Sequence, residues 1–243
     1  MIKKIKQILV LFLLLGQNAN AEIKTYEIGV EDYISYPYQY VENGKYLGKY
    51  RLILDRFAES EGIKFEYRPY KLSKLYSQFY QGNIDFKFPD NPVWRSDEKA
   101  KYKIHYSEFL TYYIDGLFVK KSNLKKTIKE LKTFGVAFDI IPWVLIQKEN
   151  KEKIKILKFE NCNEMISKIK TGEIDAILCN YDVMKYLLKD SVKDDEIVFN
   201  TNLPYTDNYL YLSTIKHPKL LEKFNKWIVE NREFIDRETH EKY

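Results

Sequence analysis

The 243-residue sequence is poor in cysteine, glycine and proline, and each shortage excludes a class of protein. Two cysteines, Cys162 and Cys179, are too few for the disulfide framework of a small secreted scaffold. They can still pair or stay buried and free, because sequence does not supply the separation of their Cα atoms. Nine glycines and seven prolines form no linker rich in these residues, so no flexible tether between separate domains is expected.

Histidine is also scarce, and the motifs of common enzymes are missing. The three histidines, His105, His217 and His240, are scattered, and the last two belong to the C-terminal segment. The sequence contains no G-x-S-x-G nucleophile motif, no phosphate-binding Walker loop and no H-E-x-x-H zinc motif. We therefore expect no metal, no cofactor and no catalytic residue.

The N-terminus has the pattern of a secretory signal peptide. Residues 1–21 combine a lysine-containing start, the apolar run ILVLFLLLG and a small-residue cleavage site that ends at Ala21. The run is shorter than the roughly 20 residues that a membrane span needs, and no cysteine follows it to carry a lipid. Without its three lysines the formal net charge falls from +5 to 5 − 3 = +2, which gives no electrostatic footprint for nucleic acid. We expect a soluble periplasmic protein.

Strand and helix patterns alternate along the rest of the chain. Each half reads as strand, helix, strand, helix, strand, which implies parallel sheets with crossover helices. The first strand is expected at Thr25–Val30, and the first helix at 50–62. Both halves carry the sequence Gly-x-Ile-Asp between a helix and a strand, at Gly82–Asp85 and at Gly172–Asp175. Two similar α/β lobes explain this recurrence.

Two further strand-like runs are expected to cross between the lobes. They are Ile114–Ser122 and 208–214, and an amphipathic helix is predicted for the tail that begins at Pro218. The predicted domains are a signal peptide at 1–21, a first lobe formed by 22–118 with 214–243, and a second lobe at 119–213.

Several segments, taken in order, resemble the extracellular solute-binding proteins of family 3, which bind polar amino acids for ABC importers. The segments are IGVEDYISYPYQYVENGKYLGKYRLILDRFAESEGIKFEY, FYQGNIDF, IHYSEFL and IKTGEIDAILCNYDVMKYLL. The resemblance implies an α/β protein with the type II periplasmic-binding fold: two parallel-sheet lobes joined by a two-stranded hinge. It also implies a small-molecule ligand between the lobes, an ABC permease or other membrane partner, and a monomer.

The candidate ligand-binding residues lie on four loops beyond the carboxyl ends of the predicted strands, where open parallel sheets bind ligands. They are Tyr33, Tyr36, Tyr38, Asp90, Asn91, Trp94, Arg95, Asp139, Ile140, Trp143 and Asn180. In the family an aromatic residue of the first loop stacks on the ligand. Tyr38 is the first choice for this role, with Tyr33 or Tyr36 second, whereas the alternative is a tyrosine-rich surface.

The chain departs from the family at the residues that hold an amino acid. Arg95 stands about two positions early for the carboxylate-binding arginine, and it either grips an anion or pairs with Asp97 or Glu98. Asp139 and Ile140 replace the family's Gly-Thr pair, and Asn180 replaces its ammonium-binding aspartate. Asp139 can serve as a helix cap, and Trp143 as pocket wall or core. An ordinary amino acid is therefore not the default ligand.

The sequence thus predicts a periplasmic solute-binding protein for a small polar or charged molecule. Two alternatives stay open. One is an enzyme on the same fold, of the dehydratase type, with Asp90 or Asp139 as its acid or base. The other is a sensing module that signals through a membrane protein.

Overall fold

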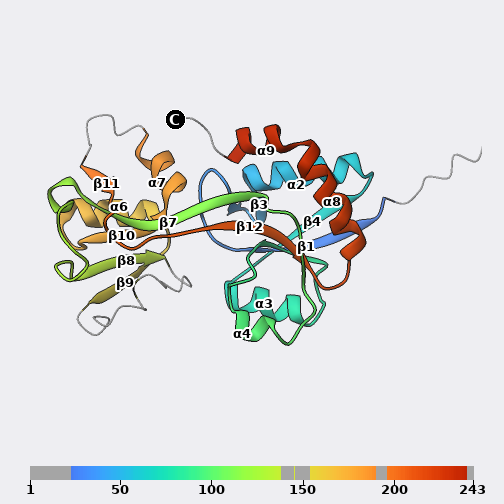
Figure 1. The fold of residues 1–243 in the computed structure, drawn as a ribbon, viewed down its shortest axis with the longest axis horizontal. Coiled ribbons are helices and arrows are strands. Elements are labelled where there is room, and N and C mark those ends of the chain that lie inside the picture. Colours follow the sequence, from blue (N-terminus) through green and yellow to red (C-terminus); the bar gives the residue numbers. More distant parts are fainter. Residues whose placement is uncertain (1–22, 138–144, 146–153, 190–195, 240–243) are drawn as a thin grey trace, which may run out of the picture.

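The structure is a computed structural model of the chain, and it describes residues 23–137, 145, 154–189 and 196–239. Figure 1 shows two bodies joined by two long strands, β7 (Thr111–Lys120) and β12 (Thr206–Thr214). One body contains the N-terminal strands and the C-terminal helices, and the other contains the middle of the chain. The two-lobed α/β fold expected from the sequence is confirmed.

The two bodies have the same strand order. In the first the order is β4-β1-β5-β12 with β6 beside β12, and in the second it is β9-β8-β10-β7 with β11 beside β7. In each body three strands are parallel to one another. The fourth is one of the two connecting strands, β12 in the first body and β7 in the second, and it runs antiparallel. The strands are β1 (Thr25–Glu31), β4 (Lys64–Tyr70), β5 (Phe86–Asp90), β6 (His105–Tyr106), β8 (Thr133–Ala137), β9 (Lys155–Phe159), β10 (Ala176–Asn180) and β11 (Ile197–Phe199), with a hairpin of β2 (Tyr40–Glu42) and β3 (Lys45–Leu47).

The crossing strands start earlier than predicted. β7 and β12 pair over Thr111–Asp115 and Thr206–Leu210, and β7 then pairs with β10 from Asp115 to Val119. The apolar pattern marked only the later part of β7, because Thr111 and Tyr112 are polar or exposed and are held by hydrogen bonds to β12. At Asp115, β7 therefore changes its pairing partner from β12 to β10, and the chain passes from the first body to the second. The lobe boundaries 22–118 with 214–243 and 119–213 stay a prediction.

Helices cover the faces of both half-sheets, as the apolar stripes predicted. The described helices of four residues or more are α2 (Lys49–Ser60), α3 (Leu72–Tyr80), α4 (Ser96–Lys99), α6 (Cys162–Thr171), α7 (Tyr181–Leu188), α8 (Pro218–Glu230) and α9 (Arg232–Thr239). None of the helices in the described residues is both long and apolar enough to span a bilayer.

The predicted C-terminal helix is two helices. α8 ends at Glu230, and α9 begins at Arg232. Asn231 between them leaves the helical conformation, with φ −114° and ψ 20°, and its side-chain Nδ2 donates to the carbonyl of Trp227 at 2.9 Å. This side-chain bond satisfies a carbonyl at the end of α8, and an amphipathic pattern alone does not reveal such a break.

The repeated Gly-x-Ile-Asp sequence performs the same structural task in both bodies. Gly82 and Gly172 lie at the ends of α3 and α6 with φ of 72° and 79°, a conformation that glycine adopts without steric cost. The aspartate that follows accepts backbone N–H groups at the start of the neighbouring strand: Asp85 from Glu27 at 2.8 Å, and Asp175 from Lys132 and Thr133 at 2.8 and 2.9 Å. The signature is therefore a helix-to-strand connection used twice.

Candidate ligand-binding site

The loops beyond the strand ends of the two bodies meet at one contact. Tyr33 follows β1 in the first body, and its hydroxyl lies 3.9 Å from the sulfur of Cys162 in the second. Cys162 begins α6, directly after β9. Burial, together with the charges of Asp182 in α7 and Asp115 on β7, raises the pKa of Tyr50 in α2. The region between the bodies therefore lies at the carboxyl ends of their strands, where α/β proteins bind ligands.

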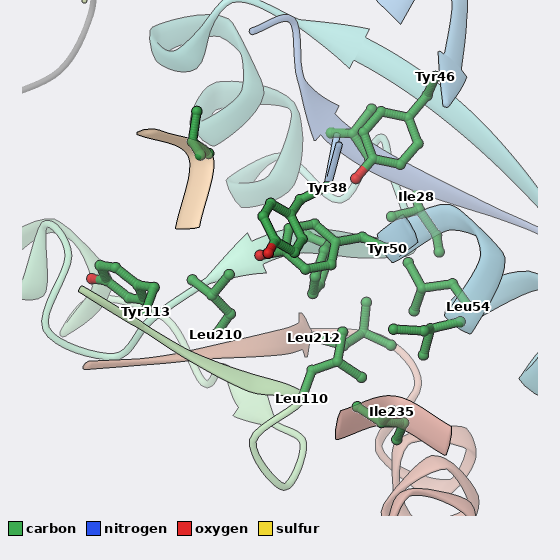
Figure 2. Close-up of a cluster of buried hydrophobic side chains, with 14 of the residues drawn as sticks. Ile28, Tyr38, Tyr46, Tyr50, Leu54, Leu110, Tyr113, Leu210, Leu212 and Ile235 are labelled. Carbon is green, nitrogen blue, oxygen red and sulfur yellow. The ribbon is translucent and has the colours of Figure 1, made fainter. Parts of the chain in front are cut away.

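The three candidate tyrosines of the first loop have different surroundings. Tyr33 contacts the second body, whereas the ring of Tyr36 lies 4.4 Å from that of Tyr40 within the same segment. Tyr38 is only 4% exposed and packs at 5.6 Å against Tyr50. Figure 2 shows Tyr38 and Tyr50 in the middle of a buried cluster of side chains. Of the three, Tyr33 contacts the second body through Cys162, and ligand contact by each tyrosine stays a prediction.

A tight turn and one glycine hold this loop in place. The backbone N–H of Ser35 donates to the carbonyl of Gln39 at 2.8 Å, which closes the loop on itself. Gly48 has φ of 113°, and a Cβ atom there would stand 2.4 Å from the carbonyl oxygen of Tyr38. Only glycine fits so close to another backbone at this φ, so the start of α2 packs directly on the tyrosine loop.

Asp90 and Asn91, two of the candidate ligand-binding residues, lie in the interior of the first body, and ligand contact by either stays a prediction. Their side chains are buried, and Asp90 is 0% exposed. Asp90 accepts hydrogen bonds from Lys87 at 3.1 Å and from Lys99 at 2.6 Å through one carboxylate oxygen, and from Ser213 at 2.7 Å through the other. The carboxylate is therefore fully used inside the first body, at the end of β5.

Two lysines share this one carboxylate, which leaves an excess positive charge in the interior. Burial lowers the pKa of Lys99 to about 8, against the opposing effect of Asp90. Lys99 also donates to the carbonyl of Asn91 at 2.6 Å, and Lys87 donates to that of Pro89 at 2.6 Å. The charged side chains of the predicted loop thus fasten the end of β5 to α4.

Asn91 connects the same loop to the crossing strand β12. Its amide nitrogen donates to the side-chain oxygen of Asn208 at 2.9 Å and to the carbonyl of Tyr209 at 2.7 Å. Its amide oxygen accepts the N–H of Val93 at 2.9 Å. These bonds account for the burial of the side chain, and they tie the candidate loop to a strand that links the bodies.

Trp94 and Arg95 point in different directions. The indole N–H of Trp94 donates to the hydroxyl of Tyr113 on β7 at 3.2 Å, so Trp94 leans toward the crossing strands. The guanidinium of Arg95 lies 4.5 Å from the ring centre of Tyr76 and 3.6 Å from the carboxylate of Glu98. The pairing of Arg95 with Glu98 is one of the two roles that the sequence left open.

Arg95 also lines a hollow of about 260 Å³ on the first body, between α3 and α4. Its lining residues are Ser73, Tyr76, Ser77, Tyr80, Gln81, Arg95, Glu98 and Tyr102. The residues come from the first body alone. This hollow is therefore distinct from the region where Tyr33 meets Cys162.

Asn180 ends β10 and begins α7. Its side-chain oxygen accepts the N–H groups of Asp182 and Val183 at 3.0 and 3.1 Å, which makes it the helix N-cap. Its side-chain nitrogen donates to a carboxylate oxygen of Asp115 at 3.4 Å. Both ends of the amide are therefore engaged within the protein, and binding of a ligand by Asn180 stays a prediction. Asp139, Ile140 and Trp143, the remaining candidates, lie outside the described residues.

Sequence reasoning missed one feature of this region and left a second one open. The first is Asp115, whose pKa is raised to about 6 because the surrounding protein removes it from water. A carboxylate inside the apolar run of β7 is the sequence signal that could have identified it. The second is a disulfide between Cys162 and Cys179, whose Cα atoms lie 6.2 Å apart. The sequence left this pairing open, and the fold brings the start of α6 beside the end of β10.

Comparison with known proteins places the chain among solute-binding proteins in fold. No family model matches the sequence. The probable amino-acid-binding protein YxeM of Bacillus subtilis is 25% identical over 207 residues, which cover 82% of this chain and 75% of the relative. The structure of the amino acid ABC transporter substrate-binding protein AbpA of Streptococcus pneumoniae, bound to L-arginine, matches with a TM-score of 0.65 at 20% identity and covers 88% of this chain and 92% of that one.

A third match is an ancestral amino-acid-binding protein described as a precursor of cyclohexadienyl dehydratase. Its TM-score is 0.63 at 22% identity, and the match covers 86% of this chain and 90% of that one. The neighbours are mostly binding proteins, and this one stands close to an enzyme. The chain has the type II periplasmic-binding-protein fold and is similar to the substrate-binding proteins of amino-acid ABC transporters.

Proposed function

We propose that the protein is a periplasmic solute-binding protein that captures a small polar or charged molecule between its two bodies and delivers it to an ABC importer. The observation that carries this proposal is the architecture. Two bodies of identical strand order are joined by two crossing strands, and their strand-end loops meet at Tyr33 and Cys162. Such an arrangement suits closure around a ligand by a hinge motion.

The transport partner and the compartment are further parts of the proposal. The expected signal peptide at 1–21 supports export, and the similarity to ABC transporter substrate-binding proteins supports a permease as membrane partner. We propose that the mature protein acts as a monomer. Arginine, histidine and glutamine are bound by structural neighbours, which makes amino acids and related metabolites the first compounds to test.

The test is native mass spectrometry of the mature protein, followed by a thermal-shift screen of amino acids, amines, organic acids and sugars. A ligand that binds only the folded state raises the melting temperature, by an amount that grows with its concentration over Kd. We expect at least one copurified or added small molecule to do so. If no compound shifts the melting temperature and none copurifies, solute binding is contradicted.

A dehydratase-like enzyme is the second candidate. Asp115 favours it, because a carboxyl group with a pKa near 6 can give and take protons at neutral pH. The match to a precursor of a dehydratase points the same way. Incubation with prephenate separates the two functions: conversion of prephenate makes the protein an enzyme, whereas a thermal shift without turnover supports binding.

A further inference from the structure

Asp115 lies where β7 stops pairing with β12 and starts pairing with β10 of the second body. In the sheet it stands opposite Thr206 of β12 on one side and opposite Asn180 of β10 on the other. Asn180 is the last residue of β10, so Asp115 lies level with the carboxyl end of a parallel strand. A group bound at this carboxylate would touch the hinge itself.

Tyr113 and Trp94 lie on the same part of the fold as this carboxylate. Tyr113 is two residues before Asp115 on β7, and residues two apart on a strand share a face. Tyr113 is held by the indole of Trp94, which donates to its hydroxyl at 3.2 Å. The charge of Asp115 adds to the effect of burial in raising the pKa of Tyr33 and that of Tyr113. The charge of Asp115 is therefore felt at both tyrosines, and the strand places Tyr113 on the same face as the carboxylate.

Among the described residues Asp115 has no cation within ion-pairing distance, unlike Asp85 and Asp90. Asp85 is paired with Lys216 and His217, and Asp90 with Lys87 and Lys99. Within the described residues the carboxylate of Asp115 accepts a hydrogen bond from the neutral amide of Asn180, at a long 3.4 Å. An ionised carboxylate in this position is poorly stabilised by the protein alone.

We propose that Asp115 receives the positive charge of an organic cation, which binds between the two bodies against the rings of Tyr33, Tyr113 and Trp94. This inference rests on the proposed function and names its substrate class. An ammonium or guanidinium group satisfies a carboxylate by a charge-assisted hydrogen bond and is attracted to the faces of aromatic rings. A bare metal ion is a poorer fit, because it prefers a shell of several oxygen ligands to a lining of rings.

The test compares ligands that differ in charge and little else. The probes are L-arginine, its near-isosteric neutral analogue L-citrulline, agmatine, which lacks the carboxylate of arginine, and L-lysine, putrescine, choline and L-glutamate. Affinities are measured by isothermal titration calorimetry, and melting temperatures by thermal shift. We expect one or more of the cations to bind, citrulline to bind at least tenfold more weakly than arginine where arginine binds, and glutamate not to bind.

The variant Asp115→Asn keeps the side-chain shape and removes the charge. It should weaken binding of the cation on the order of 10- to 100-fold, the usual size of a hydrogen bond between charged groups. Its melting temperature without ligand should be no lower than that of the unaltered protein. The matched control is Asp207→Asn on β12, where the carboxylate is exposed, and this variant should bind as the unaltered protein does.

The outcomes separate this inference from the proposed function. A neutral or anionic compound as the tightest ligand, or a cation whose affinity is the same in Asp115→Asn, overturns the inference and leaves solute binding intact. Absence of binding by every compound in this set and in the wider screen overturns both. If Asp115→Asn fails to fold, the ligand comparison on the unaltered protein decides, and equal affinities for cations and their neutral analogues contradict the inference.

Discussion

At the scale of single residues, Asp90 shows how a loop rich in charge becomes part of an interior. Its carboxylate is 0% exposed and accepts bonds from two lysines and a serine. Removal of this buried carboxylate would leave the positive charges of Lys87 and Lys99 without their counter-ion, which is costly in the interior. The residue therefore contributes to stability, because both of its carboxylate oxygens accept hydrogen bonds within the first body.

Asp90→Asn tests this role. The substitution should lower the free energy of unfolding by about 3–5 kcal/mol, the range for breaking a buried ion pair. Urea denaturation followed by circular dichroism measures the change. Asp97→Asn, on exposed α4, is the control and should shift stability by no more than about 0.5 kcal/mol. A loss for Asp90→Asn as small as for the control would contradict the network.

Asp115 gives the opposite prediction. Its pKa is raised from an ordinary 3.8 to about 6, so the folded protein binds more protons than the unfolded chain between about pH 4 and pH 6. Stability must fall as pH rises through this window. Above it, the raised pKa penalises the folded state by up to about 3 kcal/mol, less the screening by water at this partly exposed side chain.

Asp115→Asn should therefore stabilise the ligand-free protein at pH 7 by about 1–3 kcal/mol and leave it unchanged at pH 4. Melting curves of both proteins across this pH range measure the difference, in which the other titrating groups largely cancel. The charge of Asp115 raises the pKa values of three titratable groups, Tyr33, Tyr50 and Tyr113. Its hydrogen-bond partner is the amide of Asn180. A pH-independent difference, or a loss of stability at pH 7, would show that the carboxylate is stabilised by the protein.

At the scale of elements, the disulfide joins the start of α6 to β10. Cys162 and Cys179 are 17 residues apart in sequence, and the bond closes that loop next to Tyr33. A crosslink of this length restricts the unfolded chain and stabilises a protein by about 2–4 kcal/mol. It also fixes the helix end that faces the first body.

Replacement of both cysteines by serine should lower the free energy of unfolding by about 2–4 kcal/mol, measured by urea denaturation. Reductant provides the control. It should destabilise the unaltered protein by a similar amount and have no effect on the Cys162→Ser, Cys179→Ser double variant. An unaltered protein that keeps its stability in reductant, while its thiols become reactive, would contradict a stabilising disulfide.

The elements themselves could be predicted from local sequence, because their signals are local. The glycines Gly82 and Gly172 ended helices as expected, since each occupies a left-handed conformation. The alternation of strands and helices gave the parallel sheets, and apolar stripes gave the helices. The break at Asn231 was not predictable, because it depends on one side-chain bond within a continuous apolar pattern.

The candidate site was predictable only in part, because its contacts are long-range. The sequence located the loops at the strand ends but not the direction in which their side chains point. The sequence did not predict that Lys87 and Lys99 are buried, because a lysine is rarely buried unless it is paired, here with Asp90. The nearness of Asp115 to Asn180 depends on the register of two strands that lie far apart in the chain.

At the scale of the whole molecule, the two bodies touch near the carboxyl ends of their strands, where α/β proteins bind ligands. The crossing strands β7 and β12 hold them together at one side, and Tyr33 reaches from the first body to Cys162 in the second. A ligand that contacts both bodies favours the closed arrangement by its difference in affinity for the closed and open states. Side chains at the contact therefore influence affinity even where they do not touch the ligand.

Tyr33→Ala tests this coupling. The substitution removes the contact with Cys162 and should weaken binding of the ligand identified by the screen about tenfold, equivalent to about 1.4 kcal/mol. It should also reduce the ligand-induced decrease in the radius of gyration measured by small-angle X-ray scattering. Tyr36→Ala is the matched control, because Tyr36 stands in the same loop but packs on Tyr40 at 4.4 Å. Since closure requires the two bodies to meet, equal affinity and equal compaction in the two variants would mean that the contact at Tyr33 does not contribute to the closed state.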